Sequence, residues 1–135
     1  MARLLPLLAF AGALLAPAPA AAQDSGSERS SEPGSVAVLR GLDKVTARTR
    51  DFEAPVGEAV EFGALAITVQ YCRKRPPEEP PEVFVFLQVD DRRTDGFGEE
   101  VDGERIFSGW MFASNPALNP LEHPVYDVWV IDCRS

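Results

Sequence analysis

The sole histidine of the chain, His123, is the first candidate for chemistry. An enzyme with a serine or cysteine nucleophile needs a general base, usually histidine, which a third group orients. Ser108, Ser114 and Asp127 are possible partners, but the sequence has no Gly-x-Ser-x-Gly nucleophile elbow. A histidine in a loop can instead order that loop by hydrogen bonding to backbone or to Glu122. We predict this structural role for His123.

Metal binding has few suitable donors. Zinc takes three or four nitrogen or sulfur ligands, whereas the chain has one histidine and two cysteines. Calcium takes oxygen ligands, and the acidic stretch 90–104, DDRRTDGFGEEVDGE, offers many. Arg92 and Arg93 interrupt that stretch, and the ligand spacing of an EF-hand is missing. We therefore predict a solvated acidic loop, no metal and no cofactor, with calcium-dependent binding as an alternative.

Aromatic residues suggest another kind of site. Trp110 and Trp129 form the candidate aromatic surface, since aromatic rings can stack on sugars. A suitably spaced pair of carboxylates can hydrolyse a glycan, so a small hydrolase or glycan-active enzyme using Asp127 and His123 is an alternative. Aromatic side chains on apolar strands more often pack in the core, and we expect core packing here.

Residues 1–22 have the pattern of a secretory signal peptide. Arg3 precedes an apolar stretch that ends at Leu15, and small residues follow up to Ala22. The apolar stretch is too short to span a bilayer as a helix, so we expect cleavage after Ala22 and no membrane span. Residues 23–35 are predicted to be a disordered leader, and residues 36–135 a small β domain.

The two cysteines, Cys72 and Cys133, are predicted to form one disulfide, because an even number of cysteines in an exported chain indicates pairing. The competing interpretation is a nucleophilic thiol at Cys133. Such a thiol needs a basic neighbour to favour the thiolate, and Asp132 beside it works against that.

Charge narrows the choice of partners. The formal net charge of −8 disfavours nucleic acid, because an acidic surface repels phosphate backbones. Basic residues nevertheless lie close together early in the domain, at Arg40, Lys44, Arg48 and Arg50. This grouping indicates ion pairs within the fold or a weak binding face, and we expect ion pairs.

The elements that would position these residues are short strands. From Val36 onward, apolar and polar residues alternate with a period of two, without sustained helical periodicity. The predicted strands are 36–39, 44–52, 59–62, 65–72, 83–90, 106–112 and 125–133. This pattern predicts an all-β, monomeric domain: a single compact antiparallel β-sandwich or barrel of about seven short strands with one disulfide. We expect the last two strands to be central in the sheet.

The strings GWMFAS (109–114) and LEHPVYDVW (121–129), with RPPEEPPE (75–82) before them, carry a family resemblance. From about Leu39 to Cys133, the chain resembles the domain of unknown function 2155 family, small exported proteins of Gram-negative bacteria. The resemblance implies a periplasmic location and a paired Cys72 and Cys133. It brings no activity and no catalytic residues.

We expect a noncatalytic periplasmic module that binds a periplasmic or envelope protein. Segment 114–124 is the candidate binding loop, because it is longer than a simple hairpin requires and carries the histidine. Its candidate contact residues are Ser114, Asn115, Asn119, Glu122 and His123.

Overall fold

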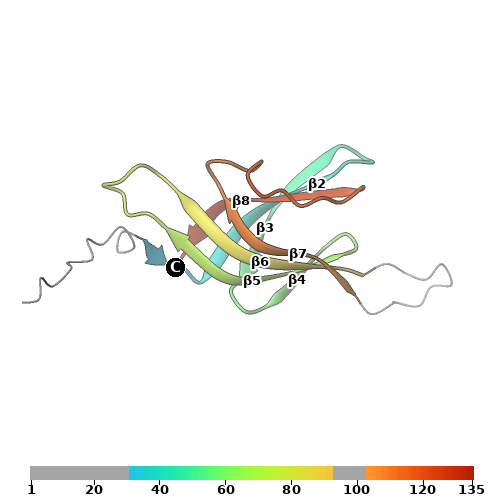
Figure 1. Ribbon diagram of the computed structural model, residues 1–135, viewed down its shortest axis with the longest axis horizontal. Helices are drawn as coiled ribbons and strands as arrows, with labels where there is room; N and C mark the ends of the chain where they lie inside the picture. The colour runs from blue at the N-terminus through green and yellow to red at the C-terminus, as the bar shows by residue number, and fades with distance from the viewer. Residues whose placement is uncertain (1–30, 93–102) are drawn as a thin grey trace, which may run out of the picture.

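The computed structural model of the chain describes residues 31–92 and 103–135. These residues form eight strands in two antiparallel sheets and contain no helix, which confirms the predicted all-β class (Figure 1). A helix long and apolar enough to cross a membrane is therefore not found in either range.

The first sheet consists of β1 (Glu32–Pro33), β4 (Ala59–Phe62), β5 (Leu65–Lys74), β6 (Val83–Asp91) and β7 (Glu104–Phe112). Its order is β1-β5-β6-β7, and β4 pairs with the beginning of β5. The second sheet consists of β2 (Val36–Asp43), β3 (Arg48–Pro55) and β8 (Tyr126–Arg134), in the order β3-β2-β8.

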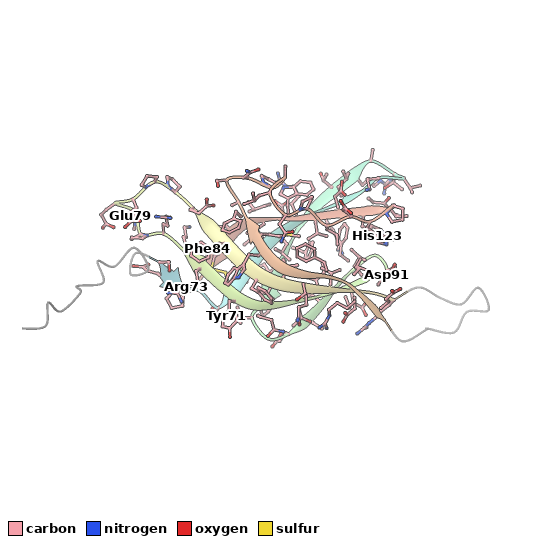
Figure 2. All side chains as sticks on the ribbon, viewed as in Figure 1. Tyr71, Arg73, Glu79, Phe84, Asp91 and His123 are labelled. Carbon is pink, nitrogen blue, oxygen red and sulfur yellow. A yellow bond between two sulfur atoms is a disulfide. The ribbon has the colours of Figure 1, made fainter. Side chains whose placement is uncertain are left out.

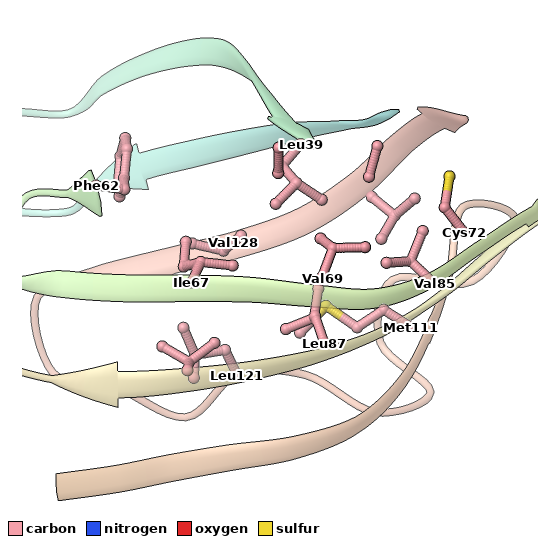
Figure 3. Close-up of a cluster of buried hydrophobic side chains, with 14 of the residues drawn as sticks. Leu39, Phe62, Ile67, Val69, Cys72, Val85, Leu87, Met111, Leu121 and Val128 are labelled. Carbon is pink, nitrogen blue, oxygen red and sulfur yellow. The ribbon is translucent and has the colours of Figure 1, made fainter. Parts of the chain in front are cut away.

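The core lies between the two sheets, because alternate residues of each strand point inward. β6 shows the pattern most clearly: Val85, Leu87 and Val89 are fully buried, while the residues between them are half-buried. From the second sheet, Leu39 and Val128 pack against the same cluster (Figure 3). This two-layer packing makes the fold a β-sandwich.

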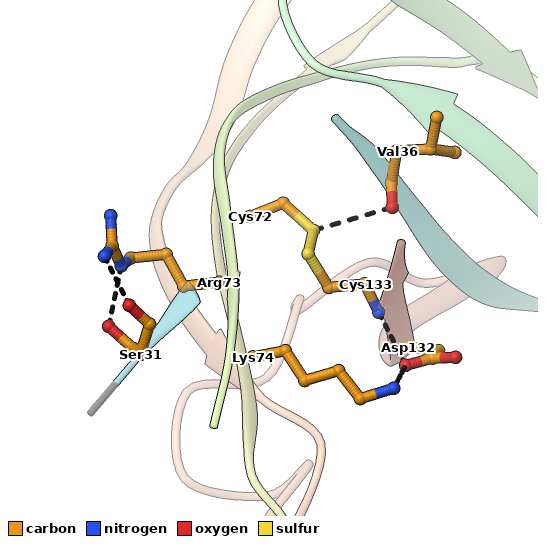
Figure 4. The surroundings of a disulfide bond; sticks show 7 residues. All are labelled: Ser31, Val36, Cys72, Arg73, Lys74, Asp132 and Cys133. Carbon is orange, nitrogen blue, oxygen red and sulfur yellow. Dashed lines mark hydrogen bonds and ion pairs between the residues drawn. A yellow bond between two sulfur atoms is a disulfide. The ribbon is translucent and has the colours of Figure 1, made fainter. Parts of the chain in front are cut away.

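The predicted disulfide joins the two layers. Cys72 on β5 and Cys133 on β8 are bonded, with Cα atoms 5.9 Å apart. Beside the bond, Lys74 Nζ lies 2.8 Å from Asp132 Oδ1, so an ion pair also links the same two strands (Figure 4).

The expected central position of the last two strands is wrong. β7 is the edge of the first sheet and β8 is an edge of the second, whereas β6 and β2 are interior strands. Apolar content misled the prediction, because an edge strand of a sandwich still buries one face against the opposite sheet.

The first hairpin is also displaced from its prediction, which placed a strand over 44–52. β2 continues to Asp43, the turn covers 44–47, and β3 begins at Arg48. Gly41 therefore lies within a strand, where a Cβ atom would come within 2.3 Å of the Phe62 ring. The absence of a side chain at Gly41 lets the Phe62 ring approach the backbone closely, so this glycine does not mark a turn.

The folded domain begins before Val36, where its start was predicted. Arg73 donates to the Ser31 hydroxyl and carbonyl oxygens, both at 2.8 Å, and β1 pairs with the end of β5. Of residues 31–35 of the expected disordered leader, Glu32 and Pro33 are thus part of the sheet, and the N–H groups of Gly34 and Ser35 donate to the Cys72 and Arg134 carbonyls. The expected signal peptide, residues 23–30 of the leader and residues 93–102 of the acidic stretch lie outside the described residues.

Candidate binding surface

The His123 side chain is buried between the two sheets, and both of its ring nitrogens are hydrogen-bonded. Its side chain is 6% exposed, and its Nε2 lies 3.2 Å from Oδ2 of Asp91, which is 2% exposed. The other ring nitrogen, Nδ1, accepts the backbone N–H groups of Val125 at 3.0 Å and Tyr126 at 3.1 Å. The ring also stacks on Tyr126. Figure 2 labels His123 and Asp91, which lie near the same end of the sandwich.

This arrangement fixes the tautomer of His123. Because Nδ1 accepts two hydrogen bonds, the ring proton must lie on Nε2, which donates to Asp91. Both ring nitrogens are therefore engaged inside the protein. The predicted loop-ordering role matches this geometry, with Asp91 in place of Glu122 as the carboxylate partner.

The other residues of the predicted binding loop mostly fasten the loop to the sheet. The backbone N–H of Ser114 lies 3.2 Å from the Glu82 carboxylate, which also accepts from the Ser114 hydroxyl. Asn119 donates to the Trp110 carbonyl at 3.0 Å, and the Asn115 N–H donates to the Phe112 carbonyl at 3.3 Å.

Leu121 anchors the centre of this loop in the core, where it is 4% exposed, and Glu122 is exposed beside it. With Asn119 bonded to the Trp110 carbonyl, the loop lies against part of the free edge of β7. An uncovered edge strand can pair with other chains, so the loop contributes protection as well as exposed side chains.

The structure does not bring Trp110 and Trp129 together. Trp129 lies on β8 in the second sheet, opposite Arg40 of β2. Trp110 lies on β7 in the first sheet and is 37% exposed, because its neighbour Met111 takes the inward position. The expected core packing of Trp110 is therefore wrong.

Trp110 belongs to a surface that we call the aromatic strip, on the outer face of the first sheet. Its members come from three adjacent strands and are half-buried or exposed: Tyr71, Phe84, Phe86, Trp110 and Phe112. Tyr71 is 62% exposed, and its ring is inclined by 24° to that of Trp110 with centroids 6.3 Å apart. Phe86 meets Trp110 edge-on at 5.4 Å.

Cross-strand register builds the strip. Tyr71 lies opposite Phe86, which lies opposite Trp110, and Phe84 lies opposite Phe112. A β-bulge between Val69 and Tyr71 sets this alignment on β5. Without the register, Tyr71 and the two phenylalanines of β6 could not be assigned to a common face, so the sequence analysis missed them. The signal for β6 was present in VFVF, whose alternate aromatics occupy one face.

Polar side chains border the strip on both sides. On one side a hydrogen-bonded row crosses three strands, with Gln70 donating to Gln88 at 3.3 Å and Gln88 donating to Ser108 at 3.3 Å. On the other side Arg73, half-buried, lies opposite Phe84. The strip thus has an aromatic centre and a polar rim.

Beyond the glutamine row, the first two acids of the acidic stretch have partners of their own. Asp90 makes a bidentate ion pair with Arg105 at 2.9 and 3.4 Å, and this hydrogen bonding raises the pKa of Arg105. Asp91 contacts His123. Over the two described ranges, histidine, cysteine and carboxylate side chains do not gather in groups of three or more that could hold a metal ion.

The fold and surface define a class: a small disulfide-linked β-sandwich with an exposed aromatic face. Residues 37–133 match the family described as an uncharacterized protein conserved in bacteria (DUF2155), and the chain belongs to this family. It is also similar to an uncharacterized protein of Rickettsia prowazekii (strain Madrid E), with 27% identity over 92 residues. That match covers 68% of this chain and 56% of the relative, so the chain spans little more than half of the relative's length. No solved structure matches the chain.

Proposed function

We propose that this protein is an exported, noncatalytic periplasmic module that binds an envelope or periplasmic protein through its aromatic strip. The observation that carries the proposal is the exposure of Tyr71 and Trp110 at the centre of a ring cluster. Large exposed apolar patches with a polar rim are typical of interaction sites.

The residue types of the strip match those of protein–protein interfaces. Tryptophan, tyrosine and arginine are enriched among the residues that dominate binding energy, and charged acids are depleted at the centre. The strip presents Trp110 and Tyr71, with Arg73 on its rim, and contains no carboxylate, although the chain has 21 acidic residues. We therefore assign the partner as a protein that inserts apolar side chains between these rings.

The surroundings of His123 favour binding over hydrolysis. A general base must reach the proton that it abstracts, whereas the His123 ring is buried and hydrogen-bonded at both nitrogens. Asp127 lies on β8, with Oδ1 3.2 Å from Lys44 Nζ. The two residues of the hydrolase alternative are thus engaged in contacts that hold the fold together.

A second candidate is noncatalytic glycan binding, favoured by the small angle between the Tyr71 and Trp110 rings. Such rings can stack on the apolar faces of sugars, and the adjacent Gln88 and Ser108 side chains can hydrogen-bond hydroxyl groups. The two candidates share one surface and differ in the partner's chemistry.

Crosslinking in intact cells separates the candidates. We expect the wild type to be captured with one envelope or periplasmic protein, and Tyr71→Ala and Trp110→Ala each to weaken that complex by about 30-fold or more, as for hot-spot truncation. Leu118→Ala is the matched control, because this side chain is exposed and apolar but lies outside the strip. Unchanged capture by the strip variants contradicts the proposal. Cosedimentation of the pure protein with peptidoglycan, abolished by Trp110→Ala, supports the glycan candidate instead.

Export rests on the pattern of residues 1–22 and is supported by the disulfide, since disulfides persist in oxidising compartments. We expect the mature chain to begin at Gln23, which mass spectrometry of the purified periplasmic fraction measures. A chain that retains Met1 and fractionates with the cytoplasm contradicts export.

A further inference from the structure

A cavity of about 390 Å³ opens at the end of the sandwich away from the aromatic strip. The β2–β3 hairpin, the turn between β4 and β5, and the start of β8 form it. The strip lies near the end of β5, at Tyr71, whereas the cavity lies before its beginning, at Gly63. The two surfaces are therefore independent.

Two aromatic rings form an apolar wall of the cavity. The Phe62 and Tyr126 rings meet edge-on with centroids 5.6 Å apart. Each ring packs on a glycine: Phe62 over Gly41, and Tyr126 over Gly63, which has φ +58°. A Cβ atom at either glycine would come within 2.3 Å of the ring. The two glycines therefore allow the wall to form.

The cavity lining also carries a formal charge of +1, from Arg48 and Arg50 against Asp43. Of the basic residues grouped in the sequence, Arg40 pairs with Asp51 at 2.6 Å and Lys44 with Asp127 at 3.2 Å. Arg48 and Arg50, which line the cavity, form no ion pair within residues 31–92 and 103–135.

The position of Arg50 is set by aromatic rings, because its guanidinium lies 5.8 Å from the Phe52 centroid and 5.2 Å from that of Phe62. Asp43 also lines the cavity, but its Oδ1 accepts the backbone N–H groups of Val45 and Thr46 in the hairpin turn. The Asp43 carboxylate therefore stabilises the hairpin turn.

We propose that this cavity binds a carboxylate carried on an apolar or aromatic group, of the size of one or two amino-acid residues. The planar guanidinium matches a carboxylate with two parallel hydrogen bonds. The apolar group would lie mainly against the half-buried Tyr126 ring, because Phe62 is 5% exposed. Thr46 and Thr49 add hydroxyl groups to the lining. The volume falls within the range of about 300–1,000 Å³ found for ligand pockets. The ligand is either the C-terminal end of a peptide or a free small acid.

Isothermal titration of the purified protein with matched probes tests the proposal. The probes are N-acetylphenylalanine, a tetrapeptide ending in phenylalanine with a free carboxylate, the amide of each, and inorganic phosphate. We expect each free acid to bind about tenfold or more tightly than its amide, as for hydrogen bonds to a charged group, and more weakly as salt is added. Phosphate should bind weakly, because it offers nothing to the aromatic wall. A tighter tetrapeptide identifies a peptide end, and equal binding identifies a small acid; both support carboxylate recognition.

Variants locate the binding. Arg48→Gln and Arg50→Gln should each weaken binding of the free acids by about tenfold. Arg105→Gln is the matched control, because it removes the same charge from β7, outside the cavity. Four results would overturn the proposal. They are equal binding of acid and amide, phosphate binding as tight as that of the acids, no binding of either acid, and wild-type binding by the arginine variants. None of these results depends on the aromatic strip, whose failure would appear in the crosslinking experiment.

Discussion

His123 connects the end of one strand to the start of another. Asp91 is the last residue of β6 in the first sheet. His123 accepts hydrogen bonds from the N–H groups of Val125, just before β8, and Tyr126, the first residue of β8 in the second sheet. The disulfide joins the same two sheets at the other end of β8, through Cys133. Strand β8 is thus tied to the opposite layer near both of its ends.

Replacing His123 with alanine should lower the free energy of unfolding by about 1–3 kcal/mol, because buried polar groups lose their partners. The backbone N–H groups of Val125 and Tyr126 lose an acceptor, and the Asp91 carboxylate loses one donor. Urea denaturation measures the change. Glu122→Ala is the control, since that neighbour is exposed and should change stability by about 0.5 kcal/mol or less. Equal stability of the two variants would exclude the structural role of the histidine.

Asp132 should make stability depend on pH. Partial burial opposes its ionisation, but hydrogen bonds from Lys74 and from the Cys133 N–H outweigh that effect, so its pKa is lowered. A carboxyl whose pKa is lower in the folded state stabilises the fold above its unfolded pKa of about 3.9. That stabilisation is lost as the pH falls through the folded pKa.

Asp132→Asn should therefore be less stable than the wild type at pH 7, by about 1 kcal/mol at most, because exposed ion pairs are screened by solvent. The side chain is 38% exposed in its pair with Lys74. The difference should shrink in urea titrations at about pH 3, below the unfolded pKa. Lys74→Gln removes the same pair from the other side and should behave alike. A difference that is as large at pH 3 as at pH 7 would refute this assignment.

The strands themselves could largely be predicted from the sequence, because burial of one face imposes alternation on the chain. Segment 83–90 was placed almost to the residue, since β6 is buried along its whole inner face. The order of the strands could not be predicted. Pairing depends on contacts between segments far apart in the chain, so the edge positions of β7 and β8 left no mark in local sequence.

Removing the disulfide should have the largest effect of any single link between strands. Cys72 and Cys133 are 61 residues apart in sequence, and closing a loop of that length stabilises the fold by about 4 kcal/mol in the chain-entropy model. The Cys72→Ala/Cys133→Ala variant should lose about that much in urea denaturation. Reducing agent should produce the same loss in the wild type and none in the variant. A reducing agent that destabilises both proteins alike would show that its effect does not come from this bond.

For the molecule as a whole, two regions of the described surface differ in their chemistry. The aromatic strip lies on the outer face of the first sheet, and the arginine-lined cavity lies between the sheets at one end. Trp110 and the group of basic residues could be identified from the sequence, but local sequence does not indicate which of these side chains stay exposed. Arg40 and Arg48 look alike in sequence, and only the folded hairpin gives one of them a carboxylate partner, Asp51.

The central claim is that the aromatic strip is where the partner binds. Site-specific photo-crosslinking tests it most directly, with p-benzoylphenylalanine placed in living cells at one exposed position at a time. Tyr71 lies within the strip and is 62% exposed, while Leu118 lies outside it and is 63% exposed. The two positions therefore differ in location and hardly in accessibility.

We predict that the probe at position 71 yields one discrete adduct with an envelope or periplasmic protein, and that Trp110→Ala in the same chain removes it. The probe at position 118 should yield none. An adduct of equal strength from position 118, or no adduct from position 71 when the protein is folded, would contradict the account.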